Sequence, residues 1–135
     1  MASFIILKPE ALESKHVGRI ISRFEDKGYT VSNISSATVK SDLIAEHYAE
    51  HKDKDFYDSL CKQFENKRVI IFTVTSDYML ASDVVKSVRT LIGNVSTPGT
   101  IRGDFSRSFS LNAIHASDSD ESAKREIELW YSSIS

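Results

Sequence analysis

A histidine and a glutamate near the end of the chain have the residue types of a nucleophile and the acid that orients it. His115 stands in an apolar run, "NAIHA", and Glu126 follows in a segment rich in carboxylates. A carboxylate hydrogen-bonded to one imidazole nitrogen fixes the tautomer and leaves the other nitrogen free as a nucleophile or base. The alternative is a satisfied core histidine and a glutamate that extends to solvent. The pair alone does not decide between them.

Basic side chains that suit phosphate oxygens occur in three other segments. Arg102 lies in "TPGTIRGD", where Gly99 and Gly103 allow a close approach of the backbone. Lys8 follows four apolar residues, where lysine is uncommon unless its ammonium reaches a cleft. Arg89 lies off the apolar stripe of its predicted helix. Each of these has an ordinary surface alternative, and neither the P-loop nor the G-x-G-x-x-G spacing is present.

The segment "HYAEH" offers two histidines, His47 and His51, at a spacing that suits a metal. Its glutamate is not in the position that zinc proteases use, and no third ligand is evident. We therefore expect this segment to be the surface of an amphipathic helix rather than a metal site.

Hydrophobic patterning predicts the elements that must position these residues. Apolar and β-branched runs predict strands over residues 3–7, 29–39, 68–74 and 109–116. Helical spacing predicts helices over residues 17–28, 42–51, 55–66, 82–93 and 118–131, with Ser41 as N-cap of the second and a polar loop over 94–108. Without the extra helices, this is the β-α-β-β-α-β order of an α+β, ferredoxin-like fold with a four-stranded antiparallel sheet.

The predicted closing helix supports a link between its glutamate and the histidine. Ala123, Ile127 and Trp130 are spaced to face the core, and Glu126 lies on or beside the same stripe. A buried carboxylate needs a partner, because desolvating an unpaired charge is costly. His115 is the nearest candidate donor in the sequence.

Composition restricts the class of protein. The 135 residues fit a single domain, 1–135, and a formal net charge of −2 argues against general attraction to nucleic acid or acidic membranes. Cys61 is the only cysteine, which excludes an internal disulfide. No apolar run approaches the roughly 18 residues of a membrane span. We expect a cytoplasmic, reducing location.

Together the segments "LKPEAL", "VGRIISRFEDKGY", "HYAEH", "PGTIRGDF" and "NAIHASDS…ESAKREIELWY" resemble the nucleoside diphosphate kinase family. The similarity runs in order from about Ser3 to Tyr131. It implies transfer of a γ-phosphoryl group from a nucleoside triphosphate, such as ATP or GTP, to nucleoside and deoxynucleoside diphosphates. It further implies a phosphohistidine intermediate and Mg²⁺ held mainly by the nucleotide phosphates, in a homo-oligomer, either a hexamer or a tetramer.

The resemblance also implies a role for each matching residue. His115 matches the nucleophile, Glu126 the acid that orients its ring, and Ser117 the residue that supports this pair. Phe56 matches the aromatic residue on which the base stacks. The residues that match those around the phosphates and the sugar are Lys8, Tyr48, Arg89, Arg102 and Asn112.

The loop before "PGTIRGD" departs from the family's pattern. Only four residues, "NVST", separate Gly93 from Pro98, whereas the family's loop is usually longer. Val95 stands where a phosphate-contacting threonine is common, so Ser96 or Thr97 must replace it or the contact is lost. The longer loop also helps subunits to pack, which leaves the size of the oligomer open.

Two further departures affect the expected pocket entrance. Phe109 stands where a smaller apolar residue usually covers the base, and Leu111 replaces a position that is often charged. We expect an altered base or sugar preference. In addition, Asn112 and His115 would point to opposite faces of a regular strand, so their shared site requires the strand to end or bulge between them.

Two other classes of function are weighed against the enzyme. A nucleotide-binding module that lost catalysis would lack part of the site, whereas here the nucleophile, the orienting acid and the phosphate-binding cations are all present. A small RNA or DNA binder on the same fold would need exposed aromatic residues on its sheet and a basic surface.

Overall fold

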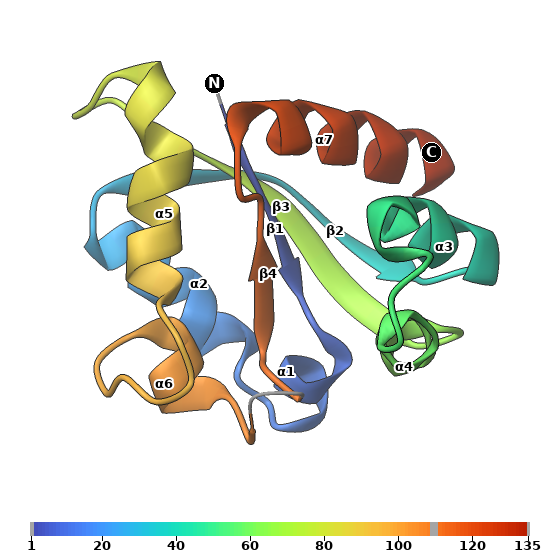
Figure 1. Cartoon of the computed structure of the whole chain (residues 1–135). Coiled ribbons are helices and arrows are strands. Elements are labelled where there is room, and N and C mark those ends of the chain that lie inside the picture. Colours follow the sequence, from blue (N-terminus) through green and yellow to red (C-terminus); the bar gives the residue numbers. More distant parts are fainter. Residues whose placement is uncertain (1, 109–110, 135) are drawn as a thin grey trace.

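Four strands form one sheet at the centre of the molecule (Figure 1). The computed structural model describes residues 2–108 and 111–134. The strands are β1 (Ser3–Leu7), β2 (Tyr29–Thr38), β3 (Arg68–Ser76) and β4 (Ile114–Ala116). Their order in the sheet is β2-β3-β1-β4, with every neighbouring pair antiparallel. This confirms the predicted ferredoxin-like α+β fold.

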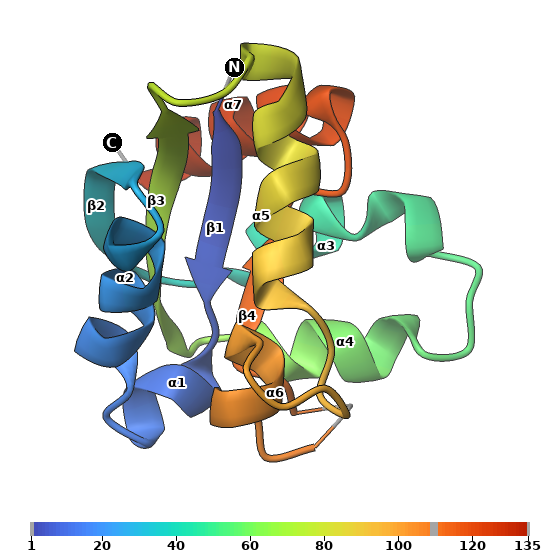
Figure 2. The ribbon, with the colours of Figure 1, turned by 90° about the vertical axis from the view of Figure 1, so that its left-hand side faces the viewer.

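Helices cover both faces of the sheet. They are α1 (Pro9–Glu13), α2 (Val17–Asp26), α3 (Ser41–His47), α4 (Tyr57–Phe64), α5 (Val84–Ile92), α6 (Ile101–Phe105) and α7 (Asp120–Ile134), with short 3₁₀ turns η1 (Ala49–His51) and η2 (Ala81–Asp83). Figures 1 and 2 show α2 and α5 on one face of the sheet and α3 and α7 on the other. None of the described helices is long and apolar enough to cross a membrane.

β1 is buried on both of its faces and separates two hydrophobic cores. Ile5 and Leu7 pack in the core under α2 and α5, while Phe4 and Ile6 pack in the core under α3 and α7. This alternation follows from the two-residue period of a strand. Because Ile6 pairs with His115 of β4, the His115 side chain points to the face covered by α3 and α7.

The last strand is shorter than predicted. The apolar run predicted a strand over 109–116, but β4 begins at Ile114, and Leu111 lies in a turn. Residues 109 and 110 lie outside the described part of the chain. Asn112 therefore precedes the strand. It is not bound to point to the face opposite His115, as it would be in a regular strand.

Three local predictions near helix ends were wrong. Ser41 is the first residue of α3 rather than its cap, and its hydroxyl donates to Glu65 Oε1 (2.7 Å). The predicted loop over 94–108 contains α6, whose N-cap Thr100 accepts a hydrogen bond from the Gly103 N–H (3.0 Å). α1 was also missed. Pro9 ends β1 as expected, but its fixed φ also suits the first turn of a helix.

Candidate functional site

A buried hydrogen-bond network joins His115, Glu126 and Ser117. His115 Nε2 lies 2.9 Å from Glu126 Oε1, and the Ser117 hydroxyl donates to the same oxygen at 2.9 Å. Ser117 also lies near β1, because the Phe4 N–H donates to Ser117 Oγ (3.2 Å). A hydroxyl has one proton, and the Glu126 oxygen is nearer to Ser117 Oγ than the Phe4 carbonyl at 3.3 Å. Ser117 therefore connects the carboxylate of α7 to the central strand.

This network determines which nitrogen of His115 is free. Glu126 Oε1 already accepts from a hydroxyl, so it acts as an acceptor toward Nε2 as well, and the neutral ring carries its proton on Nε2. The Nδ1 lone pair remains available. Burial, followed by the charges of Lys8, Arg102 and Arg89, holds the pKa of His115 well below its ordinary value. The ring is thus neutral at physiological pH, and with 17% of its side chain exposed it stays accessible.

Lys8 is buried at the end of β1, which rules out its surface alternative. Its side chain is 5% exposed, and its ammonium lies 5.6 Å from the centre of the Phe64 ring. Burial lowers the pKa of Lys8 to about 8, and the charge of Arg102 adds to this effect while Glu10 opposes it. Because burial of an ammonium is costly in desolvation, a lysine in this position is suited to bind an anion.

Both arginines are anchored to the strand that carries His115. Arg102 Nε and Nη2 donate to the Ile114 carbonyl (3.3 and 3.1 Å), and Arg89 Nη1 donates to the Ala116 carbonyl (3.1 Å). These carbonyls belong to the residues on either side of His115. Each guanidinium has five N–H donors, so both retain donors for a ligand. Burial, followed by the charge of Arg89, lowers the pKa of Arg102.

The α5–α6 connection is built around Asn94. Its Oδ1 accepts from the Ser96 N–H (3.1 Å), the Ser96 hydroxyl (2.7 Å) and the Thr97 hydroxyl (2.8 Å). Gly103 is required here, because a Cβ at that position would overlap the Thr97 carbonyl. The two candidates for the missing threonine thus bond to Asn94 in this structure, and their contact with a phosphate stays a prediction.

An ion pair that sequence reasoning missed fixes α6 against α2. Arg23 Nη1 lies 2.9 Å from Asp104 Oδ2, and Arg23 Nη2 donates to the Gly99 carbonyl (2.6 Å). Asp104 Oδ1 accepts the Gly99 N–H (3.0 Å). The pairing joins residues far apart in the sequence, so no local pattern reveals it. It helps to hold the short helix that carries Arg102.

The α3–α4 hairpin carries the two aromatic residues of the predicted site. Tyr48 follows α3, and its ring lies 6.0 Å from that of Phe64. Phe56 precedes α4 and is 49% exposed, while His51 lies between the two rings, 6.2 Å from Tyr48 and 5.7 Å from Phe56. Tyr48 acts electrostatically on Arg102. Phe56 is half-exposed and so leaves part of its ring open to solvent.

His47 is a residue whose placement the sequence prediction had wrong. It is 3% exposed, not part of the helix surface, and its ring lies 4.8 Å from that of His115. Its Nδ1 accepts the indole N–H of Trp130 (3.0 Å). Leu43 and Ile44 are the other buried residues of α3. The spacing of His47 from Leu43 was the signal that could have placed it on the buried face.

The geometry also shows a cluster with metal-ligand chemistry. One ligand atom each from His47, His115 and Glu126 lie within 4.8 Å of one another. Lys8 and Arg102 disfavour a cation there, since both oppose protonation of His115. Hydrogen bonds already engage His47 Nδ1, His115 Nε2 and Glu126 Oε1. We therefore assign no resident metal to this cluster.

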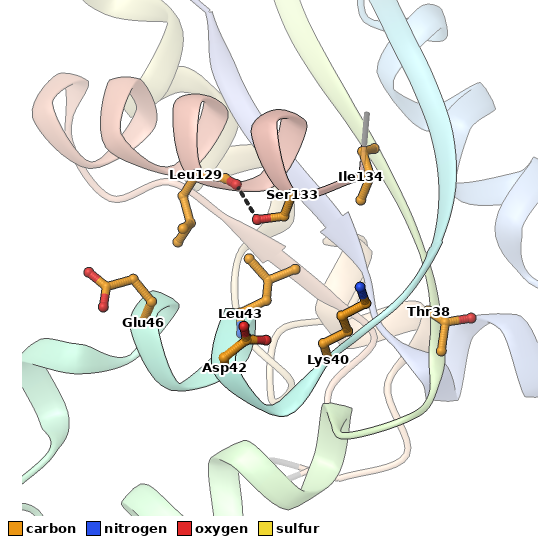
Figure 3. A pocket seen from close by; sticks show the side chains of 8 residues that line it. All are labelled: Thr38, Lys40, Asp42, Leu43, Glu46, Leu129, Ser133 and Ile134. Carbon is orange, nitrogen blue, oxygen red and sulfur yellow. Dashed lines mark hydrogen bonds between the residues drawn. The ribbon is translucent and has the colours of Figure 1, made fainter.

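A separate hollow of about 340 Å³ lies between α3 and the end of α7 (Figure 3). Leu43 and Glu46 of α3 face Leu129 and Ser133 of α7 across it. None of the predicted site residues lines this hollow. This hollow thus lies apart from the histidine cluster.

Leu111 lines another hollow, of about 660 Å³, together with Asp55, Asp58 and Lys62 near the start of α4. This places Leu111 close to the segment that carries Phe56. The second departure at the expected entrance, Phe109, lies outside the described residues.

Comparison with known proteins gave consistent matches over nearly the whole chain. The family model described as nucleoside diphosphate kinase matches residues 2–135. The nucleoside diphosphate kinase of Methanococcus maripaludis is 40% identical over 133 residues, covering 96% of each chain. That of Mycobacterium tuberculosis is 39% identical over 134 residues, covering 96% of this chain and 95% of the relative.

Solved structures agree with the sequence matches. The Aquifex aeolicus nucleoside diphosphate kinase has a TM-score of 0.88 at 29% identity, covering 96% of this chain and 93% of that one. The Encephalitozoon cuniculi nucleoside diphosphate kinase has a TM-score of 0.87 at 32% identity, covering 96% and 87%.

Proposed function

The chain belongs to the nucleoside diphosphate kinase family of phosphotransferases, and from this premise we propose that it works in two half-reactions through a phosphohistidine at His115. The observation that carries the proposal is the hydrogen bond from Nε2 to Glu126, which leaves Nδ1 as the free nucleophile. A neutral imidazole beside cations is suited to accept a phosphoryl group and to release it again.

In the first half-reaction, the Nδ1 lone pair attacks the γ-phosphorus of a nucleoside triphosphate. A P–N bond forms as the bond from phosphorus to the bridging oxygen breaks, and the nucleoside diphosphate leaves with that electron pair. The ring becomes positively charged. Its Nε2–H then donates to the Glu126 carboxylate, which stabilises this charge.

In the second half-reaction, a terminal oxygen of another nucleoside diphosphate attacks the same phosphorus. A P–O bond forms, the P–N bond breaks, and the electron pair returns to Nδ1. Both half-reactions pass through the same arrangement of donors, so each nucleotide uses one pocket in turn. The net result would keep the pools of nucleoside and deoxynucleoside triphosphates in balance.

Three cations supply the electrostatic stabilisation of the transferring group. Lys8, Arg89 and Arg102 act on His115 from the ends of three different elements. Donors aimed at the equatorial oxygens stabilise the charge of the transition state without reorganisation. The guanidinium groups of Arg102 and Arg89 keep their orientation because each donates a hydrogen bond to a carbonyl of β4.

The site also fits a nucleotide-bound Mg²⁺. Mg²⁺ prefers oxygen ligands and is often held through substrate phosphates. The charge of Asp118 raises the pKa of His115, whereas the charges of Lys8, Arg102 and Arg89 lower it. We propose that the phosphates hold most of the ion's coordination and that the Asp118 carboxylate completes it. When bound, Mg²⁺ would neutralise phosphate charge.

The rest of the nucleotide would occupy the side of the site formed by the α3–α4 hairpin. Phe56 would stack on the base, a contact that tolerates every base because each has a π face. Tyr48 and Asn112 would contact the phosphates and the sugar. Nucleoside tri- and diphosphates, including ATP and GTP, are therefore the proposed partners, with no role for nucleic acid or a membrane.

The short 94–97 segment and the residues at the entrance predict that some nucleotides are better substrates than others. Leu111 lines the hollow beside α4, where the base would enter. We expect kcat/KM to differ among purine and pyrimidine diphosphates or between their ribose and deoxyribose forms. Turnover measured across the full set tests this, and equal values throughout would contradict it.

A homo-oligomer and a cytoplasmic location complete the proposal. The family resemblance supports a hexamer or a tetramer. Because the loop that helps subunits to pack is short here, the sequence does not decide between these two sizes. Light scattering of the purified chain distinguishes the two, and a monomer would contradict the expectation. Cell fractionation tests the location.

The experiment that tests the two-step reaction is intact mass spectrometry after brief incubation with ATP and Mg²⁺. We expect the wild-type chain to gain one acid-labile phosphoryl group and to lose it when a nucleoside diphosphate is added. The His115→Ala variant should gain none. A folded, ATP-binding chain that gains no phosphoryl group would instead support a nucleotide-binding module without catalysis.

A further inference from the structure

The second buried histidine, His47, is fixed in one protonation form by its surroundings. It ends α3, and its Nδ1 accepts the Trp130 indole N–H at 3.0 Å. An indole N–H can only donate, so Nδ1 must present a lone pair. The His47 ring is therefore neutral, with its proton on Nε2. Protonation of Nδ1 would require the bond to Trp130 to break.

This ring stands directly against the proposed nucleophile. The centres of the His47 and His115 rings are 4.8 Å apart, with an interplanar angle of 78°. Potential ligand atoms of His47, His115 and Glu126 lie within 4.8 Å of one another. A positive charge on His47 would compete with His115 for Glu126. It would also add to the cations that already surround His115.

Groups from every neighbouring element act on His47. Lys8 at the end of β1, His115 of β4 and Arg125 of α7 oppose its protonation, and Glu126 of α7 favours it. Its chain neighbour Tyr48 contacts it edge-on, with ring centres 4.7 Å apart. Burial and the opposing cations keep the pKa of His47 far below its ordinary value. The electrostatics and the hydrogen bond to Trp130 thus act in the same direction.

The backbone of His47 is fixed as firmly as its ring. Arg125 Nη2 donates to the His47 carbonyl (3.0 Å), and Arg125 Nη1 donates to the Glu46 carbonyl (3.3 Å). Trp130 lies on the same helix as Arg125 and is fully buried. α7 therefore holds both ends of His47 while it also supplies Glu126.

We propose that His47 is a positioning residue for His115. By accepting the Trp130 N–H it stays neutral, so that of the two histidines only His115 bonds to Glu126, and the His115 Nδ1 lone pair remains free. The inference rests on the proposed role of His115 as the phosphoryl carrier, and it adds Trp130 and His47 to the groups that set the state of that ring.

The test compares the pH dependence of phosphoryl transfer in the wild type and in Trp130→Phe. Phenylalanine keeps an aromatic ring in the core but removes the donor to Nδ1. Loss of one buried hydrogen bond of ordinary strength should raise the pH of the acid limb of kcat/KM by about one pH unit. Tyr131→Phe is the matched control, because it removes a hydroxyl of the same helix that donates to the Asn33 carbonyl. It should leave the limb in place.

A second substitution makes the result specific to His47. In the double variant His47→Asn with Trp130→Phe, the amide at position 47 cannot be protonated near neutral pH. The acid limb should therefore return to its wild-type position. His47→Asn alone keeps an acceptor where Nδ1 lies, and the acid limb of its kcat/KM profile should stay at the wild-type position.

Ring ¹⁵N NMR of the wild-type chain provides a readout independent of turnover. The proposal expects a protonated Nε2 and an unprotonated Nδ1 on His47 from pH 8 down to pH 6. A proton on Nδ1, an unchanged acid limb in folded Trp130→Phe, or a limb that stays shifted in the double variant would overturn it. A wild type that takes no phosphoryl group on His115 would contradict the proposed function instead.

Discussion

At the residue scale, the site depends on keeping His115 neutral while cations surround it. Burial and three cations lower its pKa, and the Glu126 carboxylate fixes the position of its one proton. The same carboxylate accepts from Ser117. A single acidic group therefore sets both the tautomer and the orientation of the ring, and the neighbouring His47 adds no charge.

Replacing that carboxylate tests its contribution. Glu126→Gln keeps the shape of the side chain but removes the charge that would stabilise the phosphorylated ring. A hydrogen bond to a charged group contributes about 1.5–3 kcal/mol, which corresponds to a rate roughly 10 to 100 times lower. Stopped-flow measurement of His115 phosphorylation checks this. Glu128→Gln, on the exposed side of the same helix, should match the wild type, and equal rates for the two variants would contradict the assignment.

Lys8 predicts an alkaline limit to activity. Its folded pKa of about 8 lies below the ordinary lysine value of 10.5, so the ammonium is present below about pH 8 and is lost above it. At pH 9 only about a tenth of the lysine would be charged, and kcat/KM, which reports the free enzyme, should be about tenfold lower than at pH 7.

Two variants test whether this alkaline limb of the pH profile is caused by Lys8. Lys8→Arg stays protonated over the whole range, so its profile should lose the limb even if its absolute rate is lower. Lys62→Arg, exposed on α4, should keep it. A limb that survives in Lys8→Arg would assign it to another group.

At the scale of the elements, most strands and helices were predictable because their apolar patterns are long. β1 and β3 have continuous apolar runs, and the helical spacing of α2 and α5 extends over several turns. α6 was not predictable in this way, because its five residues are too few to show a helical period. β4 was overestimated because the apolar run of the sequence begins before Ile114, the first residue of the strand, and Leu111 lies in a turn.

The candidate site was predictable only where local sequence carries its geometry. The His115–Glu126 pairing followed from the apolar stripe of the closing helix and from the need of a buried carboxylate for a donor. The hydrogen bond that fixes the His47 ring needs Trp130, and the clamp on α6 needs Arg23. Both partners lie far away in the sequence, so the fold must be known before either contact can be seen.

The clamp between α2 and α6 gives a prediction at this scale. Arg23→Ala removes a partly exposed ion pair and the donor to the Gly99 carbonyl. We expect the free energy of unfolding to fall by about 1 kcal/mol, as is typical of such contacts. Because α6 carries Arg102, the KM for ATP should rise more than kcat falls.

Urea unfolding and steady-state kinetics measure the two effects. Arg19→Ala, which removes an exposed arginine of the same helix, is the matched control and should change neither quantity. An Arg23→Ala variant that matches this control in KM would show that α6 keeps its position without the clamp.

At the scale of the whole molecule, the two cores of the sheet have separate tasks. The core under α2 and α5 supports the α5–α6 segment and its arginines, while the core under α3 and α7 holds the histidines and Glu126. β1 belongs to both, and Lys8 follows directly after its last residue, Leu7. The groups proposed to act on a phosphate therefore meet where the two halves of the fold meet.

Burial of two neutral histidines predicts an acid-sensitive fold. The folded pKa values of His47 and His115 lie below the ordinary value near 6.5, so the unfolded chain binds more protons below that pH. Stability is therefore fully present above about pH 6.5 and is lost as the pH falls toward the folded values. Each histidine contributes up to about 1.4 kcal/mol per pH unit.

Urea unfolding at pH 7.5, 6.0 and 5.5 measures this dependence. His47→Asn and His115→Asn each remove one of the two groups, so each should lose less stability than the wild type over the same pH range. A free energy of unfolding that stays constant from pH 7.5 to 5.5 in the wild type would contradict the neutral, buried state of the pair.

The central claim is that His115 carries the phosphoryl group on Nδ1, the nitrogen that Glu126 leaves free. NMR of the protein phosphorylated with ATP and Mg²⁺, recorded under alkaline conditions that preserve phosphohistidine, tests it most directly by showing which ring nitrogen is bonded to phosphorus. We predict a single Nδ1-phosphohistidine at His115. Phosphorus bonded to Nε2, or to any residue other than His115, would contradict the account.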